Sequence, residues 1–157
     1  MAKRHISIVP LARDHHEALL LAVRLQQGKQ ALLKLWSHDP EFQARHVVSF
    51  YDQHLTKHFN AEEQALFPLA AAHILQARDM VRKLIEDHKT IAQMVGRFRS
   101  GTPGSLEQEL VSFGKLLEDH VRFEDRVLFP LIEQAPNHVL NELQQAMARY
   151  YPGEVTR

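Results

Sequence analysis

The stretch HFNAEEQALFP, at residues 58–68, is followed 62 residues later by a second stretch of the same pattern, HVRFEDRVLFP at residues 120–130. Both read H-x-x-x-E-[ED]-x-x-L-F-P. A histidine and a glutamate four positions apart lie on one face of an α-helix, one turn from each other. The repeat therefore predicts two similar helical halves, each of which presents an imidazole beside a carboxylate.

An Asp-His pair precedes each copy of the motif. Asp14-His15 lies before the first copy and Asp87-His88 before the second, each within a segment whose apolar residues recur at intervals of three and four. The two halves together supply four histidines and two glutamates, which we interpret as one metal site. Imidazole and carboxylate ligands in combination suit iron, manganese or zinc. The candidate ligands are His15, His58, Glu62, His88, His120 and Glu124.

The periodicity of the apolar residues predicts four long helices and a short extra C-terminal helix. Their expected bounds are about residues 11–36, 40–67, 76–99, 105–133 and 136–150. Long helices with short connections are typical of an all-α, up-down-up-down antiparallel four-helix bundle. We expect a single domain over residues 1–157, with the core of the bundle at about 10–133.

Local signals predict several helix ends. Asp39 followed by Pro40 is expected to cap and start the second helix, and Ser105 opens a capping box at the start of the fourth. Pro68 is expected to end or kink the second helix, and Pro130 to bend the fourth, because an interior proline lacks a donor and clashes one turn back. The residues after Pro68 are expected to form a partly helical connection.

The positions of the connections test whether the candidate ligands lie level with one another. His15 lies 23 residues before the first connection, and the middle of the His58–Glu62 pair lies 22 residues after it. At about 1.5 Å of rise per residue, these positions are level in antiparallel helices. The second connection gives 15 and 13 residues, and the third gives 14 and 20, a poorer match of about 8 Å.

Two carboxylates among four imidazoles suit a pair of ions rather than one. The simplest arrangement places His15 and His58 on one ion and His88 and His120 on the other, with the two glutamates as bridges. Coordination positions that the protein leaves open would accept solvent, an oxo or hydroxo bridge or a small exogenous ligand.

Composition excludes several other classes of function. The chain has no cysteine, which excludes disulfides, thiolate ligands and thiol catalysis. Its formal net charge is zero and it has no basic stripe, so no nucleic-acid partner is expected. The apolar run at residues 6–11 is too short for a signal peptide or a spanning helix, so we expect no membrane partner and a cytoplasmic location. Formation of a homodimer is left open.

With these motifs the sequence resembles the hemerythrin-like, or HHE cation-binding, family over roughly residues 10–133. The resemblance implies a four-helix bundle and a carboxylate-bridged pair of iron ions held by the six candidate ligands. Oxygen-carrying hemerythrins have a further histidine one turn along the third helix, where this chain has Leu84 and Ala92 on either side of His88. They also have H-x-x-x-x-D on the fourth helix, where this chain has H-x-x-x-E. These departures argue against a reversible oxygen carrier. The ligand set is more similar to the domains of iron-sulfur cluster repair proteins and of iron- or oxygen-responsive regulators.

Other polar residues near the motifs receive simpler interpretations. His16 competes with His15 as a ligand, but the height match and the parallel with the Asp-His pair at 87–88 favour His15. Glu63 and Asp125 are expected to be solvated or to contact the ligands from outside. His54 is not expected to be a ligand. Surface charge is the expected role of Asp14, Asp87 and Asp119, and a surface position that of His5, His38, His46, His73 and His138.

Three functions follow as hypotheses. The first is a non-haem di-iron protein that binds or reacts with dioxygen, peroxide or nitric oxide, for sensing, detoxification or redox delivery. The second is iron handling, such as donation of iron to damaged iron-sulfur clusters. The third is a metal site that only stabilises the bundle. Whether the protein is an enzyme is left open by the sequence.

Overall fold

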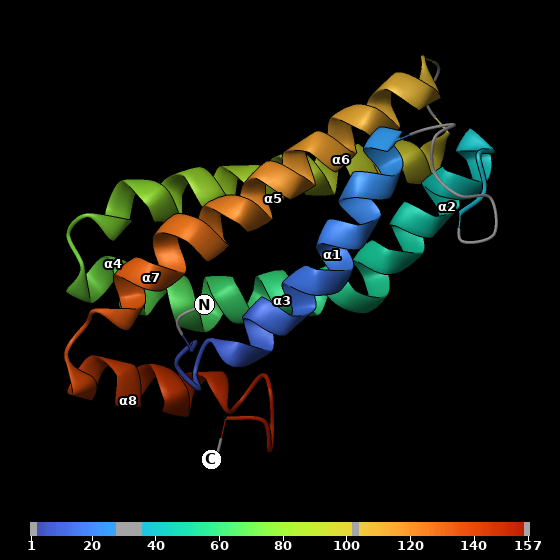
Figure 1. Cartoon of the computed structure of the whole chain (residues 1–157). Helices are drawn as coiled ribbons and strands as arrows, with labels where there is room; N and C mark the ends of the chain where they lie inside the picture. Colours follow the sequence, from blue (N-terminus) through green and yellow to red (C-terminus); the bar gives the residue numbers. More distant parts are fainter. Residues whose placement is uncertain (1–2, 28–35, 102–103, 156–157) are drawn as a thin grey trace.

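The computed structural model describes residues 3–27, 36–101 and 104–155, and every regular element in these ranges is helical (Figure 1). This confirms the predicted all-α class. The elements are α1 (Val9–Gln27), α2 (Pro40–Phe50), η2 (Tyr51–Leu55), α3 (Thr56–Ala61), η3 (Glu62–Leu66), α4 (Phe67–His73), α5 (Ala77–Ser100), α6 (Leu106–Phe123), η4 (Glu124–Leu128), α7 (Phe129–Glu133) and α8 (Asn137–Met147), where η marks a wider π-helical turn.

The first helix is shorter than the periodicity predicted, within the part of the chain that can be compared. The described helix α1 ends at Gln27, and Trp36, which was expected to be its last residue, is not helical. Residues 28–35, the remainder of the predicted span, lie outside the described residues. The predicted up-down-up-down connectivity stays a prediction, because the same residues join the first two long helices.

The second long helix starts where the sequence predicted and continues past its predicted end. The Asp39 side chain accepts a hydrogen bond from the Glu41 N–H, and Pro40 opens the helix. The chain then stays helical through η2, α3, η3 and α4 to His73, so the prediction that Pro68 ends the helix was wrong. Pro68 lies in the first turn of α4, directly after the π turn, where a missing N–H is tolerated.

Both copies of the motif contain a π turn at the same place. In η3 the Phe67 N–H bonds to the Glu62 carbonyl, and in η4 the Phe129 N–H bonds to the Glu124 carbonyl, each five residues back. Single π turns inside α-helices are often found at functional sites. Each turn begins at the glutamate that the sequence proposes as a ligand.

The third and fourth long helices agree with the sequence-based bounds. Helix α5 ends at Gly101, whose φ of 68° is a left-handed conformation that favours glycine. Ser105 caps α6 by accepting the N–H of Gln108 at 3.4 Å, as the capping box predicted. No helix in the described ranges is long and apolar enough to cross a membrane.

The long helices lie side by side along the bundle in Figure 1, and α8 crosses below them. Helix α1 packs along α6, and α5 packs against α2, α4 and α6. The buried apolar residues form two clusters. One contains residues that follow the glutamates, such as Leu66, Phe67, Leu128 and Phe129, and the other contains residues that precede them, such as Val47, Leu55, Phe113 and Leu117. The repeated His–Glu pairs lie between these two apolar regions in the sequence.

Candidate metal centre

The structure brings all six candidate ligands together inside the bundle. His15 comes from α1, His88 from α5, and the remaining four from the two motifs on α3–η3 and α6–η4. Each of the six side chains belongs to a residue that is at most 4 % exposed. Charged groups are almost never buried to this extent unless they are paired or coordinate a metal.

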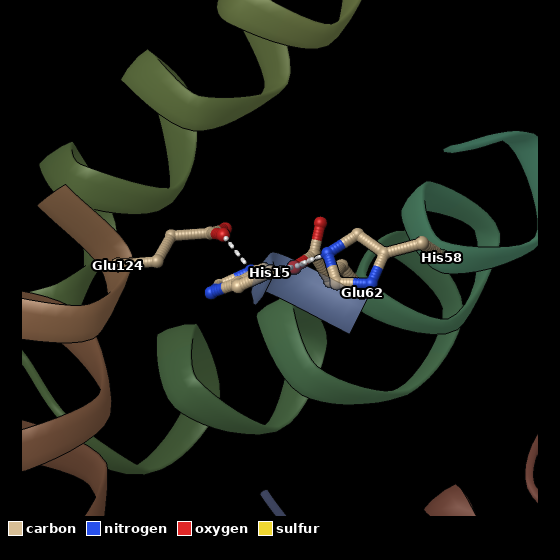
Figure 2. A group of neighbouring side chains, drawn as sticks. All are labelled: His15, His58, Glu62 and Glu124. Carbon is tan, nitrogen blue, oxygen red and sulfur yellow. Dashed lines mark ion pairs between the residues drawn. The ribbon is translucent and has the colours of Figure 1, made fainter. Parts of the chain in front are cut away.

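Each glutamate lies between two histidines, one from each half. Glu62 is 2.9 Å from His58 Nε2 through Oε1 and 3.2 Å from His88 Nε2 through Oε2. Glu124 is 3.1 Å from His15 Nε2 through Oε2 and 3.7 Å from His120 Nε2 through Oε1. Figure 2 shows His15 between Glu124 and the His58–Glu62 pair.

The six residues form two overlapping groups, within each of which the potential ligand atoms lie within 4.8 Å of one another. One group contains His15 and His58, the other His88 and His120, and both glutamates belong to both groups. This is the division of the histidines that the sequence repeat predicted. Their role as ligands stays a prediction.

The outward-facing nitrogen of every imidazole contacts a carboxylate. The Nδ1 atoms of His88 and His15 lie 2.7 Å and 2.9 Å from Glu63 and Asp125. Those of His58 and His120 lie 3.1 Å and 3.2 Å from Asp14 and Asp87. A carboxylate accepts and does not donate, so each Nδ1 carries the proton and each neutral ring turns the lone pair of Nε2 inward. Carboxylates of this kind commonly orient metal-binding histidines.

The inner atoms fit a cation better than they fit one another. His15 Nε2 and all four carboxylate oxygens of Glu62 and Glu124 are buried and have no hydrogen-bond partner among the described residues. They nevertheless lie 2.9 to 3.9 Å from their neighbours across the site. Lone pairs on nitrogen and oxygen repel at this separation unless a positive charge lies between them. The donor set of four imidazoles and two carboxylates suits a metal ion in that position.

Comparison with known proteins agrees with this geometry. The hemerythrin HHE cation binding domain matches residues 7–132. The chain belongs to this family. No curated protein and no solved structure gave a significant match. The resemblance noted in the sequence is thereby confirmed, and the cluster lies entirely within the matched range.

The prediction for two of the aspartates in this HHE domain was wrong. Asp14 and Asp87 were expected to be surface charges, because each is rotated about 100° from the adjacent histidine on its own helix. That rotation directs them toward a neighbouring helix, where they contact His58 and His120. Asp119, by contrast, is exposed and pairs with Lys115, as expected.

The remaining sequence predictions about polar residues were largely right. Glu63 and Asp125 contact imidazoles from outside, which was one of their two expected roles. His16 and His54 are exposed and take no part in the cluster. Outside the cluster lie also the histidines that were expected at the surface, half-buried His5 and His38 and exposed His46, His73 and His138.

Aromatic rings cover the imidazoles of the HHE domain. Phe59 stacks on His88, with ring centroids 3.8 Å apart and 18° between the planes. Phe129 lies nearly parallel to His15, at 5.2 Å and 6°. Both phenylalanines belong to the repeated motifs. The rings therefore exclude water from the inner atoms and strengthen the electrostatic interactions there.

The carboxylates also shift the protonation of the cluster. Burial opposes a charge on His58, but Glu62 and Asp14 outweigh it and raise the pKa of His58 to about 9. Against the same effect of burial, Asp125 holds the pKa of His15 well above its usual value. The pKa of Glu62 lies well below its usual value, because His58 and His15 stabilise its charge despite burial. A metal ion at the centre would compete with the protons that these carboxylates hold on the imidazoles.

Proposed function

We propose that the six residues of the cluster hold a pair of iron ions, and that the protein uses them to bind or react with dioxygen, peroxide or nitric oxide. The observation that carries the proposal is the set of buried, unpartnered Glu62 and Glu124 oxygens facing imidazole nitrogens from both halves. Iron accepts this mixture of imidazole and carboxylate ligands. When bound, such a pair supplies redox chemistry and coordination positions for a small molecule.

The protein itself contributes orientation and shielding. The Nδ1–carboxylate contacts of His15, His58, His88 and His120 hold the Nε2 atoms inward. Phe59 and Phe129 cover two of the rings and keep water from them. The two glutamates, each spanning histidines of both halves, are placed to join two ions. Sensing, detoxification or redox delivery in the cytoplasm are the uses we propose for such a site.

The test is the metal content of protein purified from iron-supplied cells, together with its optical spectrum after reduction and after exposure to air, peroxide and nitric oxide. We expect about two irons per chain, from the two ligand groups, and a spectrum that changes reversibly with redox state and small molecule. Zinc, or a single ion without a redox response, would refute the di-iron proposal and leave a structural site. Iron that passes readily to an apo-acceptor, without a small-molecule response, would instead identify an iron-handling protein.

A further inference from the structure

A cavity of about 520 Å³ lies beside the half of the site that contains His15 and His58. Both of these imidazoles form part of its wall. Its other buried lining residues are mainly apolar, namely Ala18, Leu55, Phe59, Leu117 and Val121. Exposed polar residues, among them His16, His54 and Lys57, line the same cavity. The cavity therefore has an apolar interior beside the cluster and polar groups toward solvent.

The other half of the site has no equivalent among the cavities found in the described residues. A depression of about 280 Å³ touches His88 and Glu63, but Phe59 is the one buried apolar residue in its lining. Half-buried or exposed residues, such as Thr56, Asn60 and Lys89, make up most of the rest. This depression is shallow and polar where the larger cavity is deep and apolar.

The internal repeat accounts for the difference between the halves. The residue three positions after the Asp-His histidine is Ala18 in the first half and Ile91 in the second, and both are buried. The residue after the motif histidine is Phe59 in the first copy and Val121 in the second. Phe59 stacks on His88, whereas its counterpart Val121 lines the large cavity. At two equivalent positions, the smaller side chain is therefore the one beside the large cavity.

Volume separates the kinds of molecule that such a cavity can hold. A water molecule or a diatomic gas needs on the order of 30 Å³. Cavities that hold small organic molecules usually measure roughly 300 to 1,000 Å³ and are lined mainly by apolar side chains with a few polar groups. The cavity beside His15 and His58, at about 520 Å³, lies within the second range.

We propose that this cavity admits a small organic molecule to the His15–His58 side of the site, and that Ala18 and Val121 set the size admitted. The molecule is apolar over most of its surface, which suits Leu55 and Leu117, and carries one nitrogen or oxygen donor atom for the metal side. The inference rests on the proposed metal centre. It extends the range of ligands from diatomic molecules and peroxide to ring-sized organic compounds.

The experiment uses the full chain loaded with Co²⁺, whose visible absorption reports ligand binding and whose paramagnetism shifts the ring N–H protons of bound histidines in NMR spectra. The two probes are azide, which has three atoms, and imidazole, which is a five-membered ring. We expect both probes to bind to the wild type and to move the signals of His15 and His58 more than those of His88 and His120. The variant Ala18→Ile copies Ile91 into the cavity. It should raise the Kd for imidazole at least ten-fold and the Kd for azide less than three-fold.

A matched control comes from the other half. Ala92 lines the shallow depression beside His88, so Ala92→Ile adds the same bulk without entering the cavity and should leave both affinities unchanged. If Ala18→Ile does not fold, Ala18→Val should give a smaller effect of the same sign. Unchanged imidazole binding in a folded Ala18 variant, or larger shifts at His88 and His120, would overturn the inference while the metal centre stands. A wild type that takes up no cobalt would overturn the metal centre itself, and the inference with it.

Discussion

The metal-free protein should lose stability as the pH rises from neutral to about 9, which is the reverse of what its metal-bound form should do. The cause is His58, whose pKa is raised from 6.5 to about 9 by Glu62 and Asp14 against the effect of burial. A histidine with a raised pKa in the folded state stabilises that state fully below its unfolded pKa. The stabilisation disappears as the pH rises through the folded pKa.

The size of the effect follows from the same shift. A move from 6.5 to about 9 corresponds to about 3 kcal/mol of folding free energy, lost between these two pH values. His15 and His88, whose pKa values are also raised, act in the same direction. For a chain of this length, 3 kcal/mol shifts the midpoint of thermal unfolding by roughly 6 to 12 °C.

The assay is thermal unfolding of chelator-treated protein, followed by circular dichroism at several pH values between 6 and 9.5. The variant His58→Gln should remove a large part of the slope. His16→Gln changes an exposed histidine outside the cluster and should keep the slope. A Tm that is flat or rises over this range in the wild type would refute the reasoning, because it would mean that the cluster does not hold its protons.

Four other changes have definite expected outcomes. In the metal-bound protein the sign reverses, because protons compete with the metal for imidazole, so the ions should dissociate as the pH falls; retention of all metal at about pH 4 over hours would contradict an imidazole-dominated site. Asp14→Asn should weaken metal binding by roughly 10- to 100-fold in a cobalt titration, whereas Asp119→Asn, an exposed change next to the other motif histidine, should not. Tyr151→Phe removes the hydroxyl that donates to Asp14 at 2.6 Å and should weaken metal binding less than Asp14→Asn does; an effect as large as that of Asp14→Asn would show that the carboxylate depends wholly on the tyrosine. Gly114→Ala should destabilise the fold by about 1–3 kcal/mol in urea unfolding, because the new Cβ would lie 2.7 Å from the Ala22 carbonyl oxygen, while Gly96→Ala, which meets nothing within 4 Å, should be neutral or stabilising.

The sequence was most informative where the repeat constrained it. His15 could be preferred over His16, and His58 over His54, because each favoured histidine has a counterpart at the equivalent place in the second half. Helix types and most bounds followed from apolar periodicity, which reports the buried face of each helix. The structure places the favoured histidines in the cluster and leaves His16 and His54 exposed.

The features that sequence reasoning missed depend on relations between helices or on backbone geometry. Asp14 points away from the ligand face of its own helix, and only the position of α3 shows that this direction leads to His58. The continuation of the helix past Pro68 depends on a π turn, which changes the hydrogen-bond register without changing the apolar pattern enough to be read. The contrast between Ala18 and Ile91 was present in the sequence. Its consequence, a cavity on one side, required the packing of α1, α3 and α6.

The two ends of the described chain distinguish the halves of an otherwise symmetric site. Arg4 donates to the Asp125 carbonyl and its guanidinium lies 4.0 Å from the Asp125 carboxylate, which contacts His15. Tyr151 donates to Asp14, which contacts His58. Both Arg4 and Tyr151 lie outside residues 7–132, the range that the family shares. In the second half, Asp87 contacts Lys83 of its own helix instead. The segments outside the family domain thus support the half that borders the large cavity, and variants at Arg4 or Tyr151 should alter His15 and His58 while leaving His88 and His120 unchanged.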